Sequence, residues 1–257
     1  MPTTTSQAPI QDIPRETPPG SSTFLEHLGE LRRRLGICLA ALVVAIGVTA
    51  TQVHGVIDWL RRPADGLLNR FAFFSPTEPL MAYMKVACLG GVLLAMPLIL
   101  WQFWGFVRTG LTRRERSYGL AFVWWGTLLF AGGLAFAYYL LLPVSLRFLL
   151  GIGQGAFEPV ISIETYLSFV TTILFWCGLV FELPIVLVLL VNVGIVTPEW
   201  LRQQRPYAIL VLVILAAIIT PTTDAVNLLL MTVPLLVLYE LSIWLTRWVM
   251  RRTTQDR

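Results

Sequence analysis

Four runs of the sequence are long and apolar enough to cross a lipid bilayer. An α-helix rises about 1.5 Å per residue, so roughly 20 apolar residues match a hydrocarbon core about 30 Å thick. The runs cover residues 35–53, 86–107, 117–146 and 165–197, and a single charge, Glu182, interrupts the last of them. Because a segment in lipid satisfies all of its own backbone groups only as a helix, these runs predict an all-α membrane protein.

Two further apolar runs are shorter than the bilayer is thick. Residues 207–219 lie between Pro206 and Pro221, and residues 225–239 end before Glu240. A helix over residues 207–219 reaches only about 20 Å, so we expect a locally thinned bilayer beside these two runs. The sequence therefore predicts six transmembrane helices in one membrane domain, with two short C-terminal spans.

The two ends of the chain are predicted to lie outside the membrane. Residues 1–23 are rich in Pro, Ser, Thr and Gln and contain no apolar run, which predicts a disordered cytoplasmic tail and not a signal peptide. The six-span membrane domain is expected over residues 24–250, and a second cytoplasmic tail over residues 251–257.

The arginines are distributed unevenly between the two sides of the predicted bundle. Fourteen lie in the N-terminal segment, the loops at 108–116 and 198–206 and the C-terminal segment, and four lie on the other side. Because cytoplasmic loops carry the excess of positive residues, both termini are expected in the cytoplasm. The two outer loops, about 54–79 and 147–163, contain four prolines and are expected to form a structured cap.

Composition excludes several classes of function. Hydrophobic residues make up 56% and charged residues 13% of the chain, and the net charge of +4 is too small and too scattered to suggest nucleic-acid binding. The single lysine, Lys85, does not follow a glycine-rich turn, so no P-loop is present. The three cysteines lie in apolar runs and suggest neither disulfides nor a metal site. His27 and His54 flank opposite ends of the first span, so we expect neither an enzyme nor a cofactor.

Glu182 is the strongest single indication of function. A carboxylate near the middle of a span costs about 2.5–3.5 kcal/mol on insertion scales and rarely faces lipid. Pro184, two residues further on, leaves a carbonyl of the preceding turn without its donor, so the helix is expected to bend there. The sequence is compatible with a site for a polar partner or a proton. It is also compatible with a carboxyl group bonded to the freed backbone or to a nearby hydroxyl.

Two acidic residues lie within basic segments on the predicted cytoplasmic side. Glu30 precedes Arg33 and Arg34 in an amphipathic lead-in to the first span, where such a helical pair contributes only a few tenths of a kcal/mol. Glu115 lies among three arginines of the first inner loop, so local neutralisation is its simplest interpretation. If the two carboxylates converge, each would bind a guanidinium group through two hydrogen bonds, which selects arginine over lysine.

Short motifs follow one another in a fixed order along the chain. The first are HLGELRRRL at residues 27–35, SPTEP at 75–79, PLILWQFWGFV at 97–107 and RRER at 113–116. The later ones are AFAYY at 135–139, YLSF at 166–169, FELP at 181–184, RPY at 205–207 and TP at 220–221. In this order they resemble TatC, the large polytopic subunit of the twin-arginine protein translocase, over about residues 24–250.

The resemblance implies a receptor of the cell inner membrane without chemistry of its own. TatC-like proteins bind the paired arginines in the signal peptide of a folded cargo protein and recruit single-span TatA- and TatB-type subunits. Transport is driven by the proton gradient. By position, Glu30 and Glu115 would hold the signal arginines, supported by Arg32 and Phe106. Glu182 would face a concave groove and meet a polar residue of a partner helix.

The resemblance also implies roles for residues outside the signal-peptide site. Thr220 and Asn227 would form a second polar contact for a partner, and self-association into a larger complex is expected. Pro63 matches a proline of the outer cap, and Lys85 matches a basic residue for which we find no physical role. Arg114 stands where the family commonly has histidine, which adds positive charge beside the predicted arginine site.

Two other classes of function compete with the receptor. A proton-coupled secondary transporter would use Glu182 as its carrier site, but the sequence has no inverted repeat and no second acid or base at the same depth. A purely structural scaffold for other membrane subunits would not discriminate arginine from lysine in any ligand.

Overall fold

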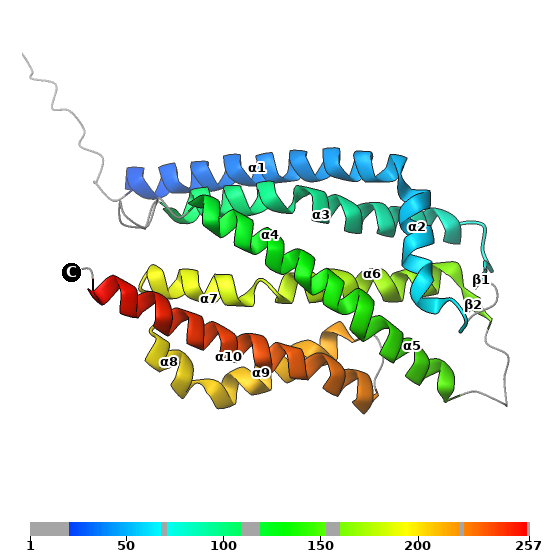
Figure 1. Cartoon of the computed structure of the whole chain (residues 1–257). Helices are drawn as coiled ribbons and strands as arrows, with labels where there is room; N and C mark the ends of the chain where they lie inside the picture. Colours follow the sequence, from blue (N-terminus) through cyan, green and yellow to red (C-terminus); the bar gives the residue numbers. More distant parts are fainter. Residues whose placement is uncertain (1–20, 68–70, 109–118, 153–159, 221–223, 256–257) are drawn as a thin grey trace, which may run out of the picture.

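The computed structural model is a helical bundle with one short parallel sheet at one end (Figure 1). It describes residues 21–67, 71–108, 119–152, 160–220 and 224–255. The helical elements are α1 (Ser21–Thr51), α2 (Val53–Arg61), η1 (Arg62–Ala64), α3 (Glu78–Val107), α4 (Gly119–Phe136), η4 (Ala137–Leu141), α5 (Leu142–Gly151), α6 (Ile163–Val180), α7 (Leu183–Asn192), α8 (Pro198–Gln203), α9 (Arg205–Ile219) and α10 (Ala225–Gln255). The strands are β1 (Phe71–Ala72) and β2 (Ile161–Ser162).

Five helical stretches among the described residues are long and apolar enough to cross a membrane. They are Leu28–Thr51, Glu78–Val107, Gly119–Gly151, Ile163–Asn192 and Ala225–Arg247, and a shorter apolar helix covers Arg205–Ile219. The prediction of an all-α membrane fold is therefore confirmed, and each long apolar run of the sequence coincides with one helical stretch.

The last predicted span is longer than the sequence suggested. Helix α10 does not end before Glu240 but continues to Gln255, and its apolar stretch covers Ala225–Arg247. Glu240 does not end the helix, because glutamate is a good helix former, and its exposed carboxylate pairs with Arg205 of α9 at 2.5 Å. The prediction of two short C-terminal spans is therefore wrong for the second of them. Helix α9, with 15 residues, is short as expected.

Two of the long stretches are not regular throughout. The stretch that contains Glu182 is divided into α6 and α7 by a turn at Phe181 and Glu182. Pro184 lies in the first turn of α7, where the missing proline N–H is tolerated, so the predicted bend is confirmed. Helices α4 and α5 are joined by the π-helical turn η4, which is followed by Pro143 in the first turn of α5.

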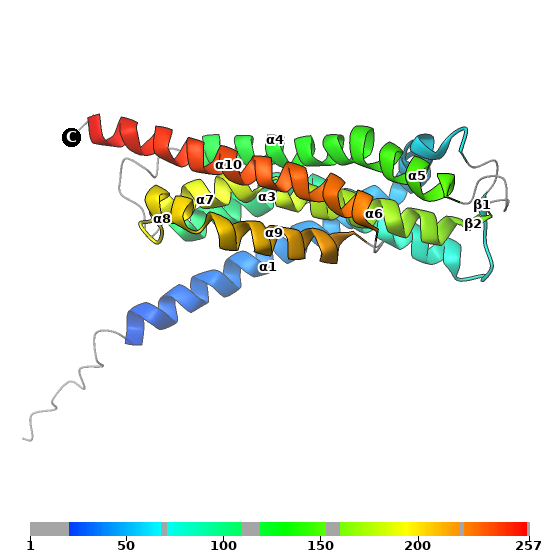
Figure 2. The same ribbon diagram turned by 90° about the horizontal axis from the view of Figure 1, so that it is seen from below.

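The helices pack in sequence-adjacent and distant pairs around a core centred on α6. Helix α1 lies along α3, α4 crosses both α3 and α6, and α10 packs on α7 and α9 (Figure 1). Figure 2 shows the N-terminal end of α1 projecting away from the other helices. Only 6% of the apolar stretch of α1 is buried within the chain, so most of this helix is left to face lipid.

A compact cap closes one end of the bundle, as the proline-rich loops predict. Helix α2 lies across the ends of α1 and α3, and strand β1 pairs in parallel with β2 (Figure 1). The hydroxyl of Tyr166 donates to the carbonyl of Leu60, and that of Tyr138 donates to the carbonyl of Trp59, each at 2.8 Å. These bonds tie the cap to α6 and η4 respectively.

Candidate functional site

Glu30 lies near the N-terminal end of α1 and is held by an arginine one turn further on. Both Nε and Nη2 of Arg34 donate to Oε1 of Glu30, at 3.0 and 2.6 Å. The third donor, Nη1 of Arg34, bonds to Oε1 of Gln102 on α3 at 3.2 Å. The local pair anticipated from the sequence is therefore present. Because Gln102 fixes the same guanidinium group, the carboxylate is positioned relative to α3 as well as α1.

Gly105 on α3 makes this arrangement possible. A Cβ atom at this position would lie 2.0 Å from Nη1 of Arg34, so the guanidinium group occupies the space of the missing side chain. Sequence analysis singled out neither Gly105 nor Gln102. Both are contained in the PLILWQFWGFV motif, where a glycine and an amide among bulky apolar residues were the available signal.

The remaining residues of the predicted signal site are only partly described. Arg32 is exposed on α1, and Phe106 is half-buried in the last turn of α3. Glu115 lies outside the described residues. The convergence of Glu30 with Glu115 therefore stays a prediction.

Glu182 is buried in the bundle at the turn between α6 and α7. Its side chain is 5% exposed, and neither carboxylate oxygen has a hydrogen-bond partner among the described residues. The interpretation in which Glu182 bonds to the freed backbone or to a hydroxyl is therefore wrong. The carboxylate lies over Gly126 of α4, where a Cβ atom would come within 3.2 Å of Oε2. Glu182 is thus almost fully buried beside α4. The groove that the resemblance implies at this residue stays a prediction.

Thr220 and Asn227 flank the connection between α9 and α10. Both side chains are buried, at 8% and 4% exposure. The Thr220 hydroxyl donates to the carbonyl of Ala216 at 2.7 Å, and the Asn227 amide donates to Oδ2 of Asp224 at 2.8 Å. Asp224 also accepts from the backbone N–H of Asn227, so it caps α10. Their role in partner binding stays a prediction.

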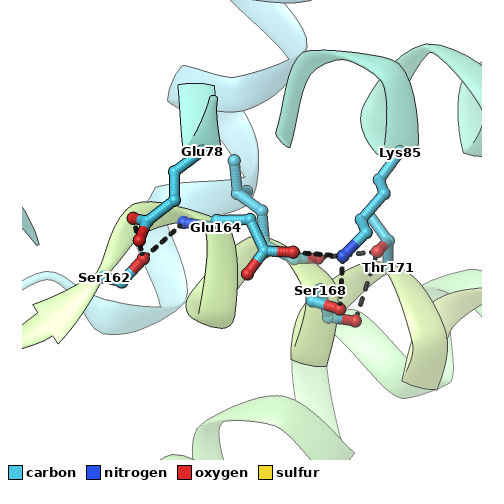
Figure 3. A network of polar contacts seen from close by, with 7 residues as sticks. Glu78, Lys85, Ser162, Glu164, Ser168 and Thr171 are labelled. Carbon is cyan, nitrogen blue, oxygen red and sulfur yellow. Dashed lines mark hydrogen bonds and ion pairs between the residues drawn. The ribbon is translucent and has the colours of Figure 1, made fainter. Parts of the chain in front are cut away.

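Lys85, for which the sequence suggested no role, belongs to a polar network between α3 and α6 (Figure 3). Its ammonium group pairs with the carboxylate of Glu164 and donates to Oγ of Ser168 at 3.0 Å. Nearer the cap, the Ser162 hydroxyl donates to Oε2 of Glu78 at 2.5 Å. The network therefore joins the N-terminal part of α3 to β2 and the first two turns of α6.

We expect Lys85→Met to lower the free energy of unfolding, because Glu164 loses the positive charge with which it pairs. Lys85 and Glu164 are 40% and 26% exposed, so the expected loss is moderate, about 1 kcal/mol in the free energy of unfolding. Denaturant unfolding of Lys85→Met, Glu164→Gln and the double variant in detergent measures the coupling. We expect the double variant to lose less than the sum of the two single losses, with Lys85→Arg close to the parent. Strict additivity would show that the pair does not stabilise the fold.

These features define a class of protein: a polytopic helical membrane protein with charged and amide groups held between its helices and no separate soluble domain among the described residues. Residues 26–234 match the family described as Sec-independent protein translocase protein (TatC). The chain belongs to the TatC family.

Curated relatives and solved structures agree with this assignment. The TatC protein of Koribacter versatilis (strain Ellin345) is 40% identical over 227 residues, which cover 86% of this chain and 83% of the relative. The TatC protein of Aquifex aeolicus (strain VF5) is 38% identical, with 88% and 95% covered. Two crystal structures of the twin arginine translocase receptor TatC superpose with TM-scores of 0.79 and 0.78 at 38% and 37% identity. They cover 86% and 87% of this chain and 99% of each solved chain.

Membership of the family decides between the classes of function. The protein is a multi-pass membrane component of a Sec-independent protein translocase, which acts together with other subunits of that complex. The family is one of translocase subunits and not of enzymes. The transporter alternative gains no support from these relatives.

Proposed function

We propose that the protein is the receptor subunit of a twin-arginine translocase. Glu30 and Glu115 bind the paired arginines in the signal peptide of a folded cargo protein, and Arg32 and Phe106 support the same surface. The subunit then recruits TatA- and TatB-type partners, and the proton gradient drives export. The solved relatives are themselves named as twin arginine translocase receptors.

The geometry of Glu30 is the observation that carries this proposal. Both Nε and Nη2 of Arg34 donate to its Oε1 atom. Through Gln102, the same arginine ties this carboxylate to α3 six residues before Arg108. The chain then enters the loop that contains Glu115. Glu30 is thereby fixed beside the origin of that loop, which favours joint binding of one ligand by the two carboxylates.

The partner sites are proposed at Glu182 and, secondarily, at Thr220 and Asn227. A buried carboxylate without an internal partner is energetically unfavourable, so a polar side chain on a neighbouring subunit would relieve its desolvation. Helix α9 has 15 residues, which is about 22 Å of helix, and the bilayer beside it is expected to thin. We propose that the signal's apolar segment slides along the bundle and that partners assemble at this thinned side, where a folded cargo needs no narrow pore.

The proposed topology has six crossings of the inner membrane, with α9 as the fifth. An even number of crossings leaves both termini on one side. The fourteen arginines that accompany the termini and the inner loops, against four on the other side, make that side the cytoplasm.

The receptor function is tested by the binding of fluorescent signal peptides to the full chain in nanodiscs. We expect a peptide with Arg-Arg to bind more tightly than the same peptide with Lys-Lys, because lysine cannot form the bidentate bond. Each of Glu30→Ala and Glu115→Ala should weaken Arg-Arg binding about tenfold or more, the equivalent of one lost charge-assisted hydrogen bond.

Glu199→Ala is the matched control, because Glu199 is an exposed acid of the second inner loop, on the same proposed side. Its Arg-Arg binding should equal that of the parent. Equal affinity for the two peptides would overturn the proposal, as would a preference that survives both Glu30→Ala and Glu115→Ala.

A further inference from the structure

A pocket of about 290 Å³ opens at the cap, where η1 approaches the π-helical turn η4. The proposed binding of signal peptides and partner helices makes no use of it. It is lined by Trp59, Arg62, Pro63, Tyr138, Tyr139 and Pro143.

The aromatic wall of the pocket is fixed by contacts within the chain. The rings of Trp59 and Tyr138 stack with centroids 3.8 Å apart and an interplanar angle of 5°. The Tyr138 hydroxyl is bound to the carbonyl of Trp59 at 2.8 Å, so this ring cannot swing away without losing that bond. Tyr139 stands edge-on to Tyr138 at 4.9 Å and is 71% exposed. Two consecutive tyrosines reach the pocket from a π-helical turn, a local irregularity that frequently marks functional sites.

Arg62 gives the pocket a positive charge. Its neighbour Arg61 is engaged, since the guanidinium carbon lies 4.9 Å from the centroid of the Phe71 ring. Arg62 is exposed, and no salt bridge involves it in the part of the chain that the structure describes. Asp65, three residues further on, is also exposed, and it contacts Arg62 through the backbone, its N–H donating to the Arg62 carbonyl at 3.0 Å. The guanidinium group is therefore available for an anion.

The position of the pocket relative to the bilayer follows from the length of the helical stretch that contributes Tyr138 and Tyr139. The stretch Gly119–Gly151 has 33 residues, which is about 50 Å of helix, whereas the hydrocarbon core is about 30 Å thick. With one boundary of the hydrocarbon core taken at Gly119, the first residue of this stretch, about 20 residues cross the hydrocarbon core, which places Tyr138 and Tyr139 at its far boundary. Tryptophan and tyrosine rings are enriched at this level, beside the lipid headgroups.

We infer that this pocket binds the phosphate of an anionic phospholipid headgroup from the leaflet on the cap side. Arg62 supplies the counter-charge, and the faces of Trp59 and Tyr139 cover the apolar part of the headgroup region. The volume admits one headgroup but is at the lower limit for larger ligands. A bound lipid would anchor the cap to the bilayer surface at the junction of α2, η1 and η4.

The test is lipid binding by the full chain, purified in a neutral detergent and analysed by native mass spectrometry with phosphatidylglycerol or phosphatidylcholine. We expect phosphatidylglycerol to be retained preferentially. Arg62→Gln should lower its affinity about fivefold, which corresponds to one arginine acting near a lipid surface. Arg62→Lys should retain most of the affinity, because the charge is kept. Arg61→Gln is the matched control and should bind as the parent does.

Several results would overturn the inference. Equal retention of the two lipids would remove the requirement for an anionic headgroup, and equal losses in Arg61→Gln and Arg62→Gln would remove the assignment to this pocket. Displacement of phosphatidylglycerol by millimolar inorganic phosphate would identify a site for free phosphate and not for a lipid. A change in oligomeric state in Arg62→Gln with unchanged lipid binding would make the pocket a protein interface. If Arg62→Gln loses affinity for phosphatidylglycerol but keeps the melting temperature of the parent, the loss is not due to misfolding and supports the inference.

Discussion

Replacing Gly133 with alanine should destabilise the protein strongly, whereas the same change one residue earlier should not. A Cβ atom at Gly133 would lie 2.7 Å from the backbone carbonyl oxygen of Cys177 and 2.8–2.9 Å from the side chain of Phe181. A backbone oxygen cannot rotate away, so α4 and α6 must separate. We expect Gly133→Ala to lower the free energy of unfolding by about 1–3 kcal/mol.

Gly132 provides the matched control. Among the described residues outside its own helical turn, none has an atom within 4 Å of a Cβ built there, and alanine favours a helix over glycine by about 1 kcal/mol. Gly132→Ala should therefore leave the free energy of unfolding unchanged or raise it slightly. Denaturant unfolding of the two variants in one detergent makes the comparison, and equal losses would show that helix packing at Gly133 is not the cause.

Gly133 belongs to a row of glycines on α4, spaced seven residues apart, that also includes the neighbour of Glu182. Gly119 lies against the Trp104 ring, Gly126 against the Glu182 carboxylate and Gly133 against the turn that precedes it. Residues seven apart share one face of a helix, so this face of α4 lies flush against its neighbours. The pattern is visible in the sequence, yet only the structure identifies what each glycine admits.

The transmembrane helices were predictable from the sequence because hydropathy is a local property. The end of α10 was not, because the apolar run stops at Glu240 whereas the helix continues to Gln255. The ion pair of Glu240 with Arg205, 35 residues away, was equally unpredictable, because it depends on the packing of α10 on α9. Lys85 has the same explanation, since its partner Glu164 lies 79 residues away. The types of the charged groups could be recognised in advance, but their pairing is a tertiary property.

In the candidate site, too, local features could be predicted from the sequence, whereas contacts between helices could not. Glu30 and its pairing with Arg34 follow from helical spacing, so sequence analysis could anticipate them. The contribution of Gln102 depends on α1 lying along α3, which no local pattern encodes. Glu182 was recognised as unusual from hydropathy alone. That it has no hydrogen-bond partner among the described residues required the structure.

Glu182→Leu should stabilise the isolated protein and at the same time weaken its binding to partner subunits. The carboxylate of Glu182 is buried with no hydrogen bond to the described residues of the parent chain, and such a group costs about 1–3 kcal/mol. Leucine has a similar volume and removes this cost, so the free energy of unfolding should rise. If the partner helix binds at Glu182 as proposed, the variant loses a charged hydrogen bond of about 1.5–3 kcal/mol, so crosslinking to TatA- and TatB-type subunits should fall at least tenfold.

A gain in stability together with a loss of partner binding in Glu182→Leu would distinguish a binding residue from a structural one. Thr171→Val is the control, because the Thr171 hydroxyl is equally enclosed but bonds to the carbonyl of Leu167 at 2.6 Å. That variant should crosslink normally and gain no stability. Arg-Arg peptide binding should be unchanged in Glu182→Leu, since Glu30 is fixed by α1 and α3. Loss of stability in Glu182→Leu would mean that the carboxylate supports the fold, and equal loss of peptide and partner binding would contradict the division between the two sites.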